Sequence, residues 1–491
     1  MAKKAYIGID NKARKVKKMY IGVGGVARKI KKAYIGVGGV ARPCFGGGEL
    51  EYYGQITNLY NKRQSCAATQ IGKYALFAGG SAKAVTQTTS AVGSVYAYNE
   101  SLTRTSTTAL STSRGSLAAT TVGNMALFLG GYNGSSVSAA DCYSETLTKE
   151  NFVSAKYARH NHAATTVGNY ALFAGGYSSS ARDAVNSVES VDSSGTQKLE
   201  RALNTIRYCL AATTVGDYAL FGGGIDADPD ATVDAYNTGL TKTIPTGLSE
   251  ARYYLAATTV GDYALFGGGM GKSKYYATVD AYDKSLTRTT PAPLSAARQR
   301  LDAATIGGYA VFGCGLIGGG EKNVVDVYDE SLTLTQTTPF SVPRYHYSAV
   351  TVGDYILFGG GQNNEDTVLT TVEAYVCERP EITINLVMWR IEGDTVYATE
   401  TQTVSFKAKL GMKYSDLAFA DTNTVELPNG CTMTIKLHDG YPAYQYKTQE
   451  KAELTVYKDT ELYVSTPLTD GMTLDFTSAV IGSLDMNWEF K

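Results

Sequence analysis

The residues with the clearest chemical potential are seven arginines that recur at one spacing, each fourteen residues before a phenylalanine. They are Arg63, Arg114, Arg159, Arg207, Arg252, Arg298 and Arg344. A guanidinium group carries a planar fork of N–H donors that matches the two oxygens of a carboxylate. The same arginines therefore allow two kinds of site: a set of partly buried ion pairs within the fold, or a ring that holds an anionic ligand.

Other metal-binding or catalytic residue types are sparse. Asp226, Asp228 and Asp230 fall in one segment and invite calcium, but the spacing and closing glutamate of an EF-hand loop are absent. Four histidines are too few for an obvious zinc or copper site, and the seven cysteines contain no Cys-x-x-Cys pair. We expect no metal ion and no cofactor, while calcium at the three aspartates stays an open alternative. The scattered cysteines indicate reduced thiols in a protein folded in a cytoplasm.

A repeat of 45 to 51 residues positions the arginines. The run Leu-Ala-Ala-Thr-Thr-Val-Gly-Asp-Tyr-Ala-Leu-Phe-Gly-Gly-Gly stands at 210–224 and again at 255–269, and weaker copies bring the total to seven. In each copy two strand-forming runs flank two residues such as Gly216-Asp217, which predicts a tight antiparallel hairpin. A third run such as Val-Asp-Ala-Tyr at 233–236 and a fourth, threonine-rich run follow. Four strands per unit and seven units predict a β-propeller.

The last unit has no fourth strand downstream, because the repeat ends near Tyr375. Residues 49–58 precede Arg63 in the same way that fourth strands precede the other arginines. We therefore predict a seven-bladed propeller over 49–377 in which the segment 49–58 completes the last blade. This closure would hide the sheet edge that an open array exposes.

Three features of each unit resemble the kelch repeat over residues 49–377: arginine before the first strand, Gly-Gly after the second, and an acid two before tyrosine in the third. The tryptophan usual in the fourth strand of kelch units is missing. The resemblance implies that each arginine bridges neighbouring strands, so that the seven form a structural ring. The expected partners are Asp141, Glu189, Asp234, Asp280, Asp326 and Glu373. The first unit has Tyr96 at this place, so Arg63 needs another partner.

Tyrosines gather in the segments that would form one face of the propeller. Loops between second and third strands vary in length, and in an antiparallel blade they share a face with the links between blades. Rings with hydrated hydroxyls suit a binding surface and could stack on sugars, or could simply cover the blade junctions. The predicted binding residues are Tyr132, Tyr157, Tyr177, Tyr208, Tyr253, Tyr254, Tyr275, Tyr276, Tyr345 and Tyr347.

Residues 1–48 form a basic arm with its own repeat of 14 residues. Residues 1–44 hold 12 Lys and Arg against one acid, whereas the remaining chain holds 33 against 45. Each copy predicts a small hairpin, which is marginally stable alone and needs a partner. The arm resembles the N-terminal repeats of tail-associated proteins of tailed phages and prophages, which implies anchoring to other virion proteins rather than to nucleic acid. The anchoring residues would be Tyr6, Tyr20, Tyr34, Arg14, Arg28 and Arg42.

Residues 378–491 lack the repeat and alternate in the manner of β-strands, which predicts a small β-sandwich or barrel. The whole chain is thus expected to be all-β. It has no run of about 18 apolar residues, so we expect no membrane insertion. No secretory signal is visible.

These patterns favour a non-enzymatic structural protein of a phage or prophage virion (tail, baseplate or decoration), assembled in the host cytoplasm as a homo-oligomer within the particle. The propeller would bind a host-surface glycan or protein, or a neighbouring virion protein. One alternative is a carbohydrate-active or carbohydrate-binding kelch enzyme, disfavoured by scarce histidine and the lack of an unexplained carboxylate pair. A second is an intracellular protein-binding scaffold. A fold alone cannot separate these functions.

Overall fold

The computed structural model describes residues 50–377 apart from 85–89, 151, 153, 318, 319 and 322, and gives strands alone within 6–45 and 381–467. The chain divides into two compact units, 1–377 and 378–491. Three antiparallel hairpins precede the propeller, one in each copy of the N-terminal repeat. They are β1 (Tyr6–Ile9) with β2 (Lys12–Lys15), β3 (Met19–Val23) with β4 (Val26–Ile30), and β5 (Ala33–Val37) with β6 (Val40–Phe45).

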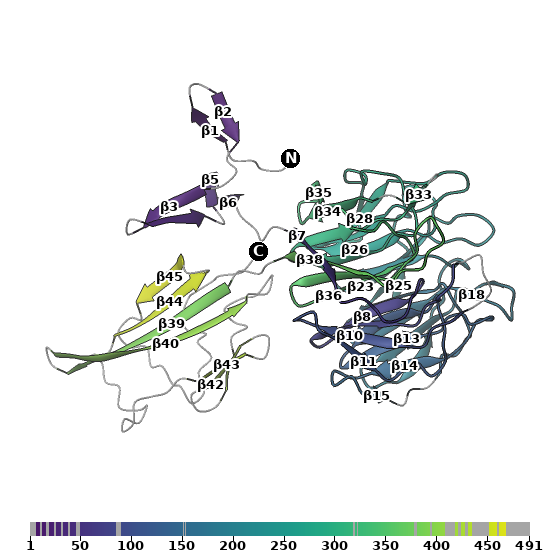
Figure 1. Ribbon diagram of the computed structural model, residues 1–491, viewed down its shortest axis with the longest axis horizontal. Helices are drawn as coiled ribbons and strands as arrows, with labels where there is room; N and C mark the ends of the chain where they lie inside the picture. Colours follow the sequence, from purple (N-terminus) through teal and green to yellow (C-terminus); the bar gives the residue numbers. More distant parts are fainter. Residues whose placement is uncertain are drawn as a thin grey trace. The chain divides into compact units, whose positions relative to one another are not determined.

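Seven four-stranded antiparallel sheets form the blades of a β-propeller, which confirms the predicted fold (Figure 1). Blades 1 to 3 are β8 (Ala67–Ile71), β9 (Tyr74–Ala78), β10 (Val95–Asn99) and β11 (Arg104–Thr107); β12 (Ala118–Val122), β13 (Met125–Leu129), β14 (Ala140–Tyr143) and β15 (Lys149–Glu150); and β16 (Ala163–Val167), β17 (Tyr170–Ala174), β20 (Val188–Asp192) and β21 (Gln197–Glu200). Blades 4 to 6 are β22 (Ala211–Val215), β23 (Tyr218–Gly222), β24 (Val233–Asn237) and β25 (Lys242–Thr243); β26 (Ala256–Val260), β27 (Tyr263–Gly267), β28 (Val279–Asp283) and β29 (Arg288–Thr289); and β30 (Ala303–Ile306), β31 (Tyr309–Phe312), β34 (Val325–Asp329) and β35 (Leu334–Thr337). Blade 7 is β36 (Ser348–Val352), β37 (Tyr355–Gly359), β38 (Val372–Cys377) and β7 (Leu50–Ile56).

The first strand of each blade is the innermost one. Each of these seven strands contacts the first strands of both neighbouring blades, and the circle closes between β36 and β8. Two-residue turns join first and second strands, with glycine at positive φ, for example +51° at Gly216. At the second turn position only Gly308 has a positive φ, so the Asn and Asp residues found there in other blades do not adopt the left-handed conformation.

The hydrophobic core lies between blades rather than inside one sheet. The second-strand phenylalanine of each blade is fully buried and lies edge-on to the third-strand tyrosine in six blades, as in Phe266 with Tyr282 at 5.9 Å. Phe266 also packs against blade 4, in a cluster with Leu220 and Val233. A Cβ on Gly222 of that blade would lie 2.8 Å from the Phe266 ring, so the first glycine of the Gly-Gly-Gly run permits this close approach.

The ring is closed by strands from both ends of the propeller sequence. β7 pairs antiparallel with β38, from Val372 opposite Ile56 to Cys377 opposite Leu50, with a bulge between Ala374 and Tyr375. Gly54, opposite Ala374, has φ of +120°, which the bulge requires. The predicted closing strand is therefore confirmed, and no blade of the described propeller leaves its third strand as an open edge.

The second unit is also built of strands. Its four-stranded antiparallel sheet has the order β40 (Thr395–Lys407), β39 (Glu381–Glu392), β44 (Lys451–Lys458) and β45 (Glu461–Pro467). A three-stranded sheet contains β41 (Ala418–Ala420), β42 (Thr424–Leu427) and β43 (Cys431–Thr434).

Two short strand pairs lie in loops of the propeller: β18 (Tyr177–Ser178) with β19 (Asp183–Ala184), and β32 (Leu316–Ile317) with β33 (Gly320–Glu321).

Removal of the closing strand should destabilise the propeller. A chain lacking residues 1–58 loses the packing of Leu50, Tyr52 and Ile56 and exposes the edge of β38. We expect a loss of about 3 kcal/mol or more in the free energy of unfolding, from the buried apolar surface alone, measured by urea unfolding. A chain lacking only 1–44 keeps β7 and should unfold at the wild-type urea concentration; equal stability of the two truncations would contradict the closure.

Candidate functional site

The seven repeated arginines are structural residues at the blade junctions. All seven side chains have 0 % exposure. Six lie within 2.9 Å of the acid of their own blade, in the pairs Arg114–Asp141, Arg159–Glu189, Arg207–Asp234, Arg252–Asp280, Arg298–Asp326 and Arg344–Glu373. The alternative of an arginine ring that grasps an anionic ligand is wrong, because these guanidinium groups are buried and the oxygens that they bind belong to the protein.

Each arginine also joins its blade to the preceding one. The guanidinium of Arg252 donates to the carbonyl of Phe266 at 3.1 Å, across the first two strands of blade 5. The backbone carbonyl of the same residue accepts from Gly224 of blade 4 at 2.9 Å, and the corresponding bonds run around all seven blades to Gly361 and Arg63. Burial lowers the pKa of the Arg159 guanidinium, and the charge of Glu189 opposes that shift.

Arg63 is the exception that the sequence anticipated. Its guanidinium donates to the carbonyl of Ser94 at 3.1 Å and to the hydroxyl of Ser94 at 2.6 Å, and lies 4.7 Å from the centre of the Tyr96 ring. The hydroxyl of Tyr96 donates to Asn61. Neutral acceptors and an aromatic face thus replace the carboxylate in blade 1.

A second ring, which the sequence analysis did not identify, lies two residues after the arginines. We call it the axial ring; its members are Ser65, Ser116, Asn161, Cys209, Tyr254, Arg300 and His346. All seven have positive φ, between +49° and +55°. Each backbone N–H donates to the carbonyl of the ring member in the preceding blade at 2.8 to 3.2 Å, and Ser65 closes the circle by donating to His346. The backbone of the axial ring is therefore the same in every blade, whatever side chain it carries.

The axial ring is chemically lopsided. Blades 1 to 3 contribute small polar side chains, whereas blades 4 to 7 contribute Cys209, Tyr254, Arg300 and His346. Tyr254 and His346 belong to blades 5 and 7, yet their rings lie 6.0 Å apart, so side chains from this half converge over the intervening blade. The guanidinium of Arg300 lies 4.7 Å from the centre of the Tyr254 ring. The signal in the sequence was the position two residues after each repeated arginine, which carries six different residue types in seven repeats.

Aromatic side chains surround this ring in two contiguous groups, which together we call the aromatic arc. In blades 2 to 4 the rings of Tyr132, His160, Tyr177 and Tyr208 follow one another at 4.9 to 5.5 Å between centres. In blades 5 to 7 the rings of Tyr253, Tyr254, His346 and Tyr345 do so at 5.1 to 6.0 Å. Six of the ten tyrosines predicted to form a binding surface therefore belong to one arrangement around the axis.

The other four predicted tyrosines lie elsewhere. Tyr157 is 46 % exposed, and Tyr275 and Tyr276 belong to the loop between β27 and β28, where Lys274 lies 4.6 Å from the Tyr276 ring. The prediction for Tyr347 is wrong: it is 6 % exposed and packs against Phe340 and Phe358 in the core. Tyr347 is two residues from Tyr345, a spacing that suggested a shared face, but its side chain points into the core just before β36. Tyr345 is also buried, at 7 %, and reaches the arc only through its contact with His346.

Burial sets the charge state of the histidines in the arc. It lowers the pKa of His160 to about 4, and together with the charge of Arg300 it lowers that of His346 to about 3. Both rings are therefore neutral near pH 7. The Nδ1 atom of His160 lies 2.9 Å from the Ser136 hydroxyl, whereas Nε2 of His346 is buried without a hydrogen-bond partner.

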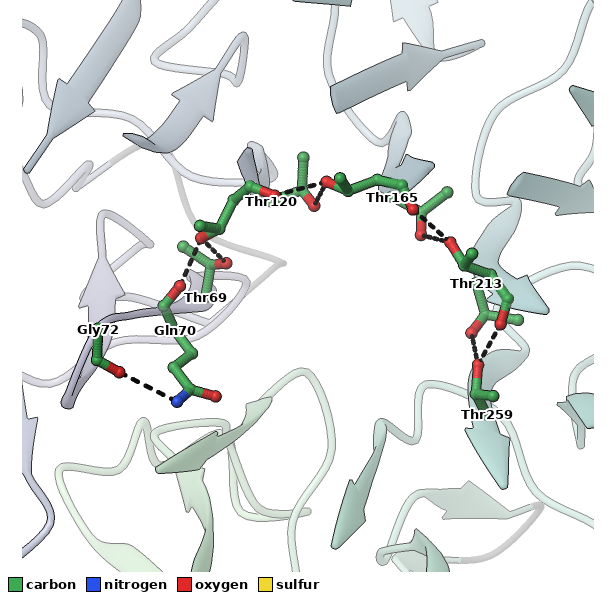
Figure 2. A pocket seen from close by; sticks show the side chains of 10 residues that line it. Thr69, Gln70, Gly72, Thr120, Thr165, Thr213 and Thr259 are labelled. Carbon is green, nitrogen blue, oxygen red and sulfur yellow. Dashed lines mark hydrogen bonds between the residues drawn. The ribbon is translucent and has the colours of Figure 1, made fainter. Parts of the chain in front are cut away.

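A polar pocket of about 550 Å³ lies between the innermost strands of blades 1 to 5, lined by Gln70, Gly72 and threonines (Figure 2). The hydroxyl of Thr214 donates to the Thr166 carbonyl at 2.7 Å, and its oxygen lies 2.8 Å from the Thr165 hydroxyl. Because the Thr214 proton is already used, Thr165 must be the donor of the second bond. The same pattern recurs between other neighbouring blades, so these hydroxyls retain only acceptor lone pairs for a ligand.

Two of the three aspartates considered as calcium ligands bind other groups of the protein. Asp230 accepts from the Thr205 hydroxyl and from the Thr232 backbone at 2.7 Å, and Asp228 lies 2.7 Å from the Lys272 amine. Within the described residues no group of three or more His, Cys, Asp and Glu side chains could hold a metal ion. His162 is buried beside Phe173 at 6.2 Å between ring centres.

The remaining expectations concern the anchoring residues of the arm, membrane insertion and the cysteines. The side chains of Tyr6, Tyr20, Tyr34, Arg14, Arg28 and Arg42 lie outside the described residues, although their positions fall in β1 to β6. Among the residues that the structure describes, no helix is long and apolar enough to cross a membrane. Five cysteines of the propeller are buried and unbridged.

Comparison with known proteins adds little to the site. No protein-family model matches the sequence, and no curated protein matches it. A solved structure titled "Structure of YjhT" resembles 58 % of this chain and 99 % of that one, at 12 % sequence identity and a TM-score of 0.44. At this identity and TM-score no inference about fold, ligand or activity follows from the likeness.

Replacement of a ring arginine should be costly wherever it leaves a carboxylate behind. Arg252→Met leaves the buried Asp280 with only Arg288, whose Nε lies 3.7 Å away, as a cationic partner, and we expect a loss of about 3 kcal/mol in the free energy of unfolding. Arg63→Met is the matched control, since Arg63 binds only neutral acceptors and its removal should cost less. Urea unfolding followed by circular dichroism measures both. Equal losses, or no recovery in Arg252→Met with Asp280→Leu, would contradict this account.

The buried histidine of the axial ring should make stability depend on pH. The unfolded chain takes up a proton on His346 near pH 6.5, whereas the folded protein does so only near pH 3, so stability falls as pH drops between these values. Between pH 7.5 and 5 the wild type should lose at most about 2 kcal/mol more than His346→Gln. Asp302, whose pKa burial raises to about 6, acts in the opposite direction but equally in both proteins. Parallel pH profiles from urea unfolding would disprove the assignment.

Proposed function

We propose that this protein is a non-enzymatic, kelch-type carbohydrate-binding protein of a phage or prophage virion. The propeller presents the aromatic arc and the axial ring to a saccharide on the host surface. The basic arm at 1–48 attaches the protein to other virion proteins. It acts as one of several identical copies within the particle, after assembly in the host cytoplasm.

The observation that carries the binding role is the aromatic arc around an axial ring of fixed backbone and variable side chains. Flat rings such as Tyr177 and Tyr208, 5.5 Å apart and half-buried, are held by their neighbours before any ligand arrives. Rigid aromatic side chains lose little conformational entropy on binding and provide both apolar faces and polar rims. Sugars present the same combination of C–H faces and hydroxyl groups, so the arc suits them.

The ion pairs formed by the third-strand carboxylates favour binding rather than catalysis. Six acids of the third strands are held in ion pairs by the ring arginines. They are therefore placed to stabilise the blades, and a pair of carboxylates flanking a sugar would have to come from other residues. The kelch assignment is supported by the same arginines, acids and double glycines, which make equivalent contacts in successive blades.

The virion role rests on the arm. Its 12 basic residues against one acid, in three copies that each form a hairpin, provide a cationic β-rich segment suited to docking on an acidic protein surface. Hairpins whose two strands have four to six residues each gain stability mainly from the surfaces that they pack against. We therefore assign the arm to assembly and the propeller to recognition.

The two roles should be separable by mutation. Tyr177→Ala with Tyr208→Ala should weaken saccharide binding at least about tenfold yet leave incorporation into particles unchanged. The chain lacking 1–44 should show the reverse. Binding is measured on a glycan array with the full chain, and incorporation by sedimentation with particles.

Tyr157→Ala is the matched control, because Tyr157 is exposed but lies outside the arc. Failure of the full chain to bind any saccharide would overturn the carbohydrate role. Incorporation without residues 1–44 would overturn the anchoring role.

A further inference from the structure

We propose that the saccharide is acidic and that its carboxylate binds Arg300, at the cationic side of the axial ring. This inference rests on the carbohydrate-binding function proposed above and narrows it to one class of ligand. It concerns an eighth arginine, outside the set of seven that stabilises the blades, at a position where the other six blades carry no positive charge near pH 7.

Arg300 differs from the buried arginines in what surrounds its charge. No carboxylate of the described residues forms an ion pair with it, whereas six of the seven ring arginines have such a partner. Its guanidinium lies on the face of Tyr254, and its Nε atom is buried without a hydrogen-bond partner. Its backbone is fixed, because the N–H donates to Tyr254 at 2.9 Å and the carbonyl accepts from His346 at 3.2 Å. The Arg300 side chain is half-buried, and a positioned guanidinium without a carboxylate partner is a binding group for an anion.

The acid nearest in sequence does not neutralise this charge. One oxygen of Asp302 accepts from the backbone of Ala303 at 2.9 Å, and the other accepts from Ala349 of blade 7 at 2.8 Å. The backbone N–H of Asp302 donates to the Tyr347 hydroxyl at 2.9 Å. Asp302 therefore points its carboxylate toward the junction between blades 6 and 7 and joins them, which leaves Arg300 available to a ligand.

The groups beside Arg300 fit the rest of a sugar. Nε2 of His346, whose backbone N–H donates to the carbonyl of Arg300, is buried without a hydrogen-bond partner. Unsatisfied buried polar atoms are costly in a folded protein, and ligand hydroxyls would satisfy them. The neutral His346 adds no second charge, so one carboxylate balances the single guanidinium. The threonine pocket offers no comparable site, because its hydroxyl protons already form hydrogen bonds within the protein.

A matched arginine elsewhere in the propeller controls for stacking and charge. The guanidinium of Arg104, at the start of the outer strand β11, lies 3.5 Å from the centre of the Tyr60 ring, and its Nε also has no partner. It differs from Arg300 in lying at the end of the blade farthest from the axial strands. Arg104→Met thus removes the same charge and the same kind of contact without touching the axial ring.

The experiment measures binding of the full-length chain to saccharide pairs that differ in the acidic group. The probes are sialyllactose and oligogalacturonate, each against its carboxyl-reduced form, and sulfated lactose. We expect the wild type to bind at least one carboxylated member about tenfold or more tightly than its neutral partner. Arg300→Met should abolish that difference, Arg300→Lys should restore only part of it because a point charge lacks the fork, and Arg104→Met should keep it. Circular dichroism melting verifies that each variant is folded.

The outcomes separate this inference from the function on which it rests. Equal binding of carboxylated and neutral members, unchanged in Arg300→Met, overturns the acidic ligand while the carbohydrate role stands. Preference for sulfated lactose over every carboxylated probe also overturns it. Binding of no saccharide by the folded wild type overturns both proposals.

Discussion

The structure depends on one residue in each blade, the buried arginine that precedes the first strand. Its side chain joins the first three strands of its own blade, and its backbone carbonyl accepts a hydrogen bond from the second glycine of the preceding blade. An unpaired guanidinium in this position would carry a large desolvation cost, so the acid of the third strand accompanies it in six blades, and the oxygens of Ser94 with the ring of Tyr96 replace the acid in blade 1. The pair fixes where the chain enters each blade, and with it the start of every innermost strand.

That fixed entry point explains how the propeller can vary its chemistry without changing its frame. The axial ring begins two residues after each arginine, and its seven N–H to carbonyl bonds involve only backbone atoms. Serine, asparagine, cysteine, tyrosine, arginine and histidine all occupy equivalent positions with nearly the same φ. The left-handed conformation costs free energy at each of these residues, and the closed circle of hydrogen bonds opposes that cost. A surface built in this way allows substitution of a side chain while the backbone that presents it stays in place.

The middle of the propeller therefore offers two different chemical environments. The threonine hydroxyls between the innermost strands have used their protons on one another and on backbone carbonyls, so they present acceptors. The axial ring presents Arg300, whose positive charge has no protein carboxylate among the described residues, beside neutral histidine and aromatic rings. Blade closure lies away from this region, because the outermost strand β7 supplies Tyr52, whose hydroxyl donates to Glu373, the partner of Arg344. Stability and recognition thus use different polar groups of the same propeller.

The sequence by itself determined the seven blades, the tight hairpins, the closing strand at Leu50–Ile56 and the partners of six arginines. The strands and turns follow from local patterns that repeat, because alternation fixes strands and glycine fixes turns, whereas the acid partners of the arginines followed from the resemblance to kelch repeats. Only the tertiary structure decided the site. Tyr345 and Tyr347 stand two residues apart and were both predicted to belong to the binding surface. In the structure both are buried, and only Tyr345 contacts the arc. Arg300 occupies a position that recurs in every blade but is the only arginine there, and its significance comes from residues up to 46 positions away in sequence that the ring brings beside it.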